Sequence, residues 1–117
     1  MIKNYNTRKL GKTSAHRSAM LKNLVTALFL NEKITTTLAK AKELARYSDR
    51  LITNAKANDL NAKKKLASQL ANKEALRKVR EVLVPRYSSR QGGFAKIYKM
   101  GLRQGDRAEM AVIKLIS

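Results

Sequence analysis

The sequence contains no cysteine, which excludes a disulfide framework and a thiolate metal site. It has a single histidine, His16, so no second imidazole is available to complete a metal site. A general base would also need an orienting partner and a reacting group. We therefore expect no metal, no cofactor and no small-molecule substrate, and we predict that the chain is not an enzyme. An RNA contact or a place at the start of a helix explains His16 better than catalysis does.

Long apolar runs are also missing. No stretch approaches about 18 consecutive apolar residues, so we expect no transmembrane helix. The N-terminus lacks the apolar core of a signal peptide, and together with the absence of cysteine this fits a cytoplasmic protein. With 1 proline and 5 glycines the sequence leaves little room for long linkers. Its 117 residues, 44% of them apolar, suffice for one domain with a modest core.

Acidic residues are scarce. Only 8 Asp and Glu accompany 26 Lys and Arg, which gives a net charge of +18 at pH 7. A field of this strength usually has a polyanionic partner, and the candidates are RNA, DNA and an anionic membrane. The acids are dispersed, and most have a cation at helical spacing, so surface pairing explains them and no catalytic carboxylate pair emerges.

Apolar residues at three-to-four spacing predict four helices. Each is preceded by a Ser, Thr, Asp or Asn residue whose side chain can accept a backbone N–H as an N-cap. We expect the helices to begin, in order, after Thr13 or Ser14, after Thr37, after Asn58-Asp59 and after Asn72. Asn31 is predicted to end the first helix in the left-handed conformation, and Pro85 to stop the fourth.

Strands are predicted where the apolar residues no longer follow the three-to-four spacing of a helix. The β-branched residues 34–37 indicate one short strand. Residues 94–100 and 110–116 are typical of a hairpin around a turn at 101–106, with Ala111, Ile113 and Leu115 on one face. The expected fold class is α+β, with about four helices packed on a small three-stranded, mainly antiparallel sheet. We assign residues 13–117 to a single globular domain and residues 1–12 to an extended basic N-terminal arm.

The N-terminal region carries six basic side chains through Lys22, and no acid appears before Glu32. A frayed terminus that happens to be basic is one interpretation. The charge of the whole chain favours the other, a segment that orders on RNA as its cations displace counterions from phosphates. The predicted RNA-binding residues here are Lys3, Arg8, Lys9, Lys12, His16, Arg17 and Lys22, and Lys40 is added from the second helix.

A second unopposed basic region lies between Val82 and Gly105. Its five cations are Arg86, Arg90, Lys96, Lys99 and Arg103, and we predict that these cations and Tyr87 bind RNA. Within it the loop 85–93 also carries hydroxyls, paired glycines and Tyr87, a composition that suits phosphate contact. Tyr87 could stack on a base or pack into the core, and the sequence leaves both open. The run Lys63-Lys64-Lys65 wraps around a helix and is interpreted as a solvated face.

Two other binding functions fit the charge less well than RNA binding. A DNA-compacting or transcriptional protein would need a helix-turn-helix or a dimer interface, and no convincing one is present. A peripheral membrane protein would place many cations beside the apolar face of one helix, whereas the first predicted helix is mostly uncharged after Lys22.

Three collinear blocks, which together cover nearly the whole chain, resemble the bacterial ribosomal large-subunit protein seventeen family. The residues of these blocks fall within 8–24 (RKLGKTSAHR, then AML and NL), 36–56 (TTLAKAKEL, then LIT and AK) and 85–111 (PRY, R, GG, G, GD, A and MA).

The resemblance implies a structural constituent of the large ribosomal subunit, with helices packed on a small, mainly antiparallel sheet. Such a protein binds large-subunit rRNA near the exit of the nascent-peptide tunnel and supports translation. By resemblance, the rRNA contacts of the N-terminal segment fall on Arg8, Lys9, Lys12, His16 and Arg17. The match also supports contacts at Arg86 and Arg90. The expected partners are neighbouring large-subunit proteins, among them the zinc-ribbon-like protein thirty-two.

Overall fold

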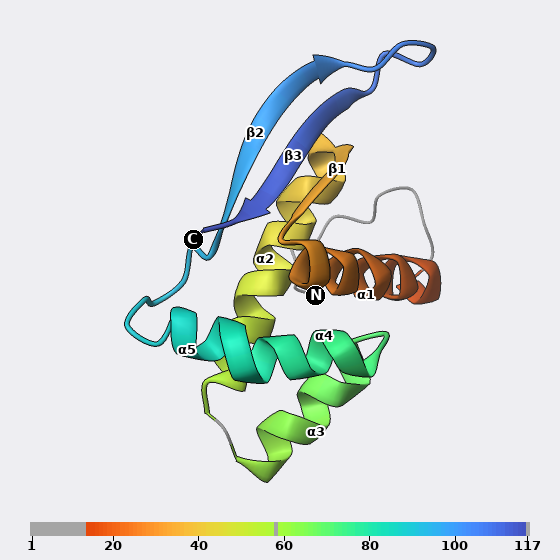
Figure 1. Cartoon of the computed structure of the whole chain (residues 1–117). Helices are drawn as coiled ribbons and strands as arrows, with labels where there is room; N and C mark the ends of the chain where they lie inside the picture. The colour runs from red at the N-terminus through yellow and green to blue at the C-terminus, as the bar shows by residue number, and fades with distance from the viewer. Residues whose placement is uncertain (1–13, 58, 117) are drawn as a thin grey trace, which may run out of the picture.

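A computed structural model describes residues 14–57 and 59–116. The predicted arm over residues 1–12, with Lys3, Arg8, Lys9 and Lys12, lies outside these residues, as does the candidate cap Thr13. Within the described part, helices pack against a three-stranded antiparallel sheet (Figure 1). This confirms the predicted α+β fold class.

Three N-caps lie where the sequence places them. The side-chain oxygens of Thr37, Asp59 and Asn72 accept backbone N–H groups at 3.4, 2.7 and 2.8 Å. The elements are α1 (Ser14–Asn31), β1 (Lys33–Thr37), α2 (Leu38–Ala55), α3 (Leu60–Gln69), α4 (Lys73–Lys78), a π-helical turn (Val79–Leu83), α5 (Val84–Arg86), β2 (Ala95–Leu102) and β3 (Glu109–Leu115).

The end of α1 differs from the prediction by one residue. The left-handed residue is Glu32, with φ 63°, rather than Asn31. Its N–H donates to the carbonyl of Leu28 at 2.6 Å, and its carbonyl accepts from Leu115 N at 2.9 Å. Its carboxylate is also paired with two cations described below. These contacts offset the cost of a positive φ in a residue with a Cβ, so tertiary structure overrides the local preference for Asn.

Pro85 does not stop the last helix. The helical run continues from Lys73 through the π-helical turn and α5 to Arg86. In that turn the N–H of Val84 donates to the carbonyl of Val79, five residues earlier. A wider turn directly before Pro85 accommodates a residue that has no N–H and whose ring crowds the preceding turn.

The strands are ordered β1-β3-β2, with both pairs antiparallel. Ala111, Ile113 and Leu115 are buried, which confirms the predicted alternation along β3. A bulge places Met100 as an extra residue in β2, and Gly101 beside it has φ 107°, a conformation that glycine adopts without strain. The hairpin turn between β2 and β3 extends away from α3 and α4 (Figure 1).

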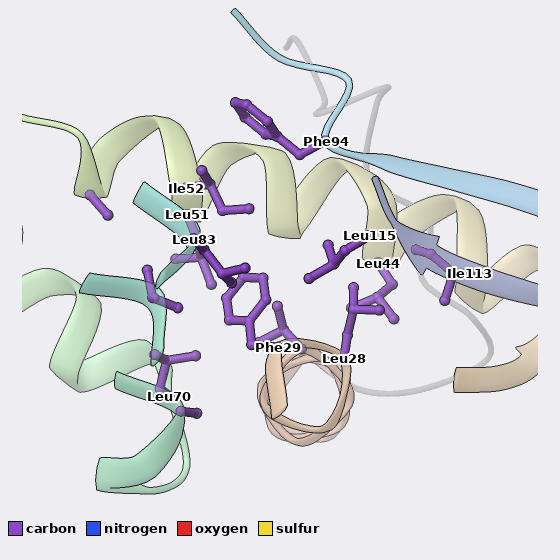
Figure 2. Packing of buried hydrophobic residues seen from close by; sticks show 14 of the residues in the cluster. Leu28, Phe29, Leu44, Leu51, Ile52, Leu70, Leu83, Phe94, Ile113 and Leu115 are labelled. Atoms are coloured by element: carbon purple, nitrogen blue, oxygen red, sulfur yellow. The ribbon is translucent and has the colours of Figure 1, made fainter. Parts of the chain in front are cut away.

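The core lies between α1, α2, the last helical run and the sheet. Leu28 and Phe29 come from α1, Leu44 and Ile52 from α2, and all four are fully buried (Figure 2). Leu83 of the π-helical turn and Ile113 and Leu115 of β3 belong to the same cluster. Thr26 joins α1 to the segment between α3 and α4, because its Oγ1 donates to the carbonyl of Lys22 at 2.8 Å and accepts from Ala71 N at 2.9 Å.

Candidate nucleic-acid interface

Several of the eight acids are neutralised within the protein. Glu32 pairs with Lys78 at 2.8 Å and with Arg86 at 2.5 Å. The buried Glu43 lies 3.4 Å from Arg46, and Asp106 lies 2.5 Å from Arg103. Basic side chains therefore predominate on the described surface, and few acids remain to oppose them. A surface of such positive potential attracts a polyanion.

Two predicted contacts meet in a groove between α1 and α2. His16 and Lys40 line an open groove of about 410 Å³, together with Met20, Asn23 and Leu24. His16 is exposed on α1, and Lys40 is half-buried in the first turn of α2. The positive end of the helix dipole adds to the Lys40 charge there. Arg17 and Lys22 are half-buried elsewhere on α1.

Arg86 forms a bidentate ion pair that joins α5 to the end of α1. Its two terminal nitrogens donate to the two carboxylate oxygens of Glu32 at 2.5 and 3.2 Å. Hydrogen bonds from Arg86 and then from Lys78 lower the pKa of Glu32 to about 2, and the same carboxylate raises the pKa of Arg86. The Arg86 guanidinium thus has a structural role, and a phosphate bound there would have to share this guanidinium with Glu32.

The position of Tyr87 decides between its two interpretations. Its side chain is 2% exposed, its hydroxyl donates to the carbonyl of Ile116, and its ring lies 5.0 Å from that of Phe94. A tyrosine that ends a helix beside an apolar core is buried when its hydroxyl finds an acceptor. The ring therefore has no open face for a base, and the expected stacking on Tyr87 is corrected to packing.

Arg90 remains exposed beyond Tyr87. Its Nε donates to the carbonyl of Gly93 at 3.2 Å, and its own carbonyl accepts from Lys56 Nζ. Lys56 also lies 4.8 Å from the centre of the Phe94 ring. These contacts hold the loop over the core while the Arg90 side chain stays accessible to a phosphate.

The three predicted cations of the hairpin do not share one face. Lys96 points away from the helices, whereas Lys99 is paired with the buried Ala111 and so lies on the other face of the sheet. Lys99 is nevertheless exposed. Arg103 lies at the turn, where its pairing with Asp106 lowers the pKa of that carboxyl to about 2.

Two lysines that the sequence did not predict as RNA contacts lie beside Lys96. The sheet register aligns Lys33 with Lys114, and Lys114 with Lys96. The alternation along 110–116 already placed Lys114 opposite the core face. The pairing of this strand with residues 33–37, however, is a long-range contact that a local pattern does not give.

Among the residues the structure describes, no group of three or more His, Asp or Glu side chains could hold a metal ion. Over the same residues, every helix is too short or too polar to cross a bilayer.

The sequence profile of the family described as Ribosomal protein L17 matches residues 20–116. The chain belongs to the ribosomal protein L17 family. This confirms the resemblance found in the sequence. Because L17 proteins are structural components of the ribosome, it also confirms the prediction that the chain is not an enzyme.

Similar relatives from several bacteria share the name large ribosomal subunit protein bL17. The protein from Endomicrobium trichonymphae is 52% identical over 117 residues, which is the full length of both chains. The one from Elusimicrobium minutum is 52% identical over 116 residues, 99% of each chain. The one from Halothermothrix orenii is 48% identical over 109 residues, 93% of this chain and 96% of the relative. The L17 likeness therefore extends over the described fold and beyond it.

Proposed function

We propose that this L17-family chain is a structural constituent of the large ribosomal subunit that binds large-subunit rRNA through its basic surface. The observation that best supports the proposal is the difference in environment between the acidic and the basic side chains. A chain with net charge +18 holds several of its acids in internal ion pairs and leaves most of its cations at the surface. Phosphates supply the missing counter-charge, and the names of the similar proteins specify a ribosomal setting.

Some predicted residues suit this role better than others. Arg86 is shared with Glu32 and Arg103 with Asp106, and the buried Tyr87 is no longer included. The proposed rRNA contacts in the described part are His16, Arg17, Lys22, Lys40, Arg90, Lys96 and Lys99. Lys3, Arg8, Lys9 and Lys12 of the N-terminal arm are proposed on sequence grounds.

The family resemblance also motivates a finer placement. We place the chain near the exit of the nascent-peptide tunnel in the cytoplasmic ribosome, with ribosomal protein thirty-two among its neighbours. Crosslinking of intact large subunits would test both parts. Crosslinks to rRNA and proteins far from the tunnel exit would contradict this location without affecting rRNA binding itself.

The N-terminal arm provides the sharpest test of rRNA binding. Changing Arg8, Lys9 and Lys12 to Glu should weaken binding to purified large-subunit rRNA and reduce the dependence of the affinity on salt, because fewer counterions are released. The affinity is measured over a series of salt concentrations. The matched control changes Lys63, Lys64 and Lys65 of α3 to Glu, which alters the net charge equally on what is interpreted as a solvated face.

Two outcomes would count against the proposal. An equal loss of affinity in both triple variants would mean that only net charge matters and that the arm makes no phosphate contacts. In growing cells, a chain that stayed at the top of a sucrose gradient after a moderate-salt wash would not be a constituent of the large subunit.

A further inference from the structure

The sheet face turned away from the helices carries three lysines side by side. Lys33 of β1, Lys114 of β3 and Lys96 of β2 occupy directly paired positions, and all three are exposed. Within the described part of the chain none of them forms an ion pair. Paired side chains on adjacent strands lie about 5 Å apart, so three like charges in a row repel one another. An anion bound over the row would turn this repulsion into attraction.

An exposed aromatic ring adjoins the lysine row. Tyr98 follows Lys96 by two residues on the same face of β2, and it is paired with Val112 of β3. Its side chain is 53% exposed, in contrast to the buried Tyr87. Lys96, Tyr98 and Lys114 line one shallow hollow of about 180 Å³, together with Leu115 and Ile116.

The remaining paired positions of this outer face contain no acid. They are Thr35, Thr37, Val112, Met110 and Gly101. The face therefore combines a row of positive charge, an accessible ring and small or apolar neighbours. A protein segment docking on the ring would have to supply acids to three lysines as well, whereas one nucleotide strand provides both phosphates and a base.

We infer that the outer face of the sheet is a platform for an unpaired stretch of RNA, with one base stacked on Tyr98 and the neighbouring phosphates along Lys33, Lys114 and Lys96. This inference rests on the proposed rRNA binding and assigns to it a distinct site. Stacking needs a base that has left its helix, so the platform selects single-stranded rRNA over duplex. Because every base has a π-face, the platform tolerates different sequences.

The ring is tested by substituting Tyr98 in the full chain. Binding is measured to an oligouridylate of about ten nucleotides and to purified large-subunit rRNA. Tyr98→Leu should weaken oligouridylate binding about tenfold, since it keeps an apolar side chain but removes the stacking surface. Tyr98→Phe keeps the ring and should bind within about twofold of the unchanged chain. Circular dichroism should show the same fold for all three proteins, because Tyr98 is exposed.

The lysine row is tested by the salt dependence of oligouridylate binding. Changing Lys33, Lys96 and Lys114 to Ala should reduce the slope of log affinity against log salt by about 2, since each phosphate contact to a single strand contributes about 0.7. The matched control changes Lys63, Lys64 and Lys65 to Ala. It removes the same charge from α3 and should leave most of the slope in place.

The outcomes separate this inference from the proposed function. If the chain bound large-subunit rRNA but Tyr98→Leu bound oligouridylate as well as Tyr98→Phe did, the platform would be wrong and rRNA binding would stand. If the unchanged chain bound neither RNA, both would be wrong. Ultraviolet crosslinking in intact large subunits should join Tyr98 to a nucleotide, and a crosslink to a protein neighbour instead would overturn the platform.

Discussion

The loop 85–93 and the outer face of the sheet have similar compositions but opposite environments. Each combines cations with a tyrosine and lacks acids of its own. In the loop, Arg86 is bound by Glu32 and Tyr87 is buried against Phe94. On the sheet, the lysines and Tyr98 stay exposed. Local composition thus identifies candidate RNA contacts, whereas partners from distant segments determine which of them remain available.

The two tyrosines give the largest expected difference. Tyr87→Leu should lower the free energy of unfolding by about 3 kcal/mol, because it removes a buried ring and leaves the carbonyl of Ile116 without its donor. Tyr98→Leu should lower it by less than about 0.5 kcal/mol, as is usual for exposed positions. Both values come from denaturant unfolding of the full chain.

A conservative change separates the contributions of the Tyr87 ring and hydroxyl to the free energy of unfolding. Tyr87→Phe keeps the ring beside Phe94 and loses only the hydroxyl, so it should be destabilised by about 1 kcal/mol. If Tyr87→Leu and Tyr98→Leu were equally stable, Tyr87 would not be part of the core and the contrast between the two regions would disappear.

The Glu32 ion pair predicts that the free energy of unfolding depends on pH, with an effect of intermediate size. The pKa of Glu32 falls from 4.5 to about 2 on folding, so its contribution is fully present above pH 4.5 and is lost as the pH falls towards 2. Because about a third of the side chain is exposed, solvent screening limits this contribution to about 1–2 kcal/mol. The free energy of unfolding of Glu32→Gln should therefore fall less steeply over this range than that of the unchanged chain.

Asp106 supplies the matched control for this experiment. Its pKa is also lowered to about 2, but by an exposed pairing within the hairpin turn that joins no distant segments. Asp106→Asn should therefore leave most of the acid-dependent loss of stability unchanged. A steeper loss of stability in Glu32→Gln than in the unchanged chain would show that the ion pair does not join α1 to α5 as the distances indicate.

Local signals predicted much of the fold. The caps at Thr37, Asp59 and Asn72 depend on side chains within three residues, and the burial along β3 depends on a period of two. The errors occurred where distant segments meet. Glu32 takes the left-handed position because Leu115, Lys78 and Arg86 hold it. The passage through Pro85 depends on a π-helical turn that no simple spacing indicates.

The candidate site was less predictable than the fold. Sequence reasoning found Lys96 because it belongs to a region without acids, but it missed Lys33 and Lys114, which join Lys96 only through the sheet register. The sequence also groups Arg86 with cations that no acid opposes, because Glu32, its partner, lies 54 residues away in sequence. Positive charge is visible in a sequence, but its neutralisation is a tertiary property.

The smallest expected effect distinguishes the two arginines of the loop itself. Arg90→Ala should weaken binding to large-subunit rRNA about threefold, the size of one lost phosphate contact, while its free energy of unfolding changes little. Arg86→Ala should instead lower the free energy of unfolding and change rRNA binding little, because it leaves Glu32 with Lys78 alone and removes a guanidinium that is already paired. Filter binding at fixed salt and denaturant unfolding, applied to both variants, give the comparison. If Arg86→Ala weakened rRNA binding more than Arg90→Ala at equal stability, the Glu32 pair would orient Arg86 towards a phosphate, and the loop would belong with the outer sheet face as an RNA contact.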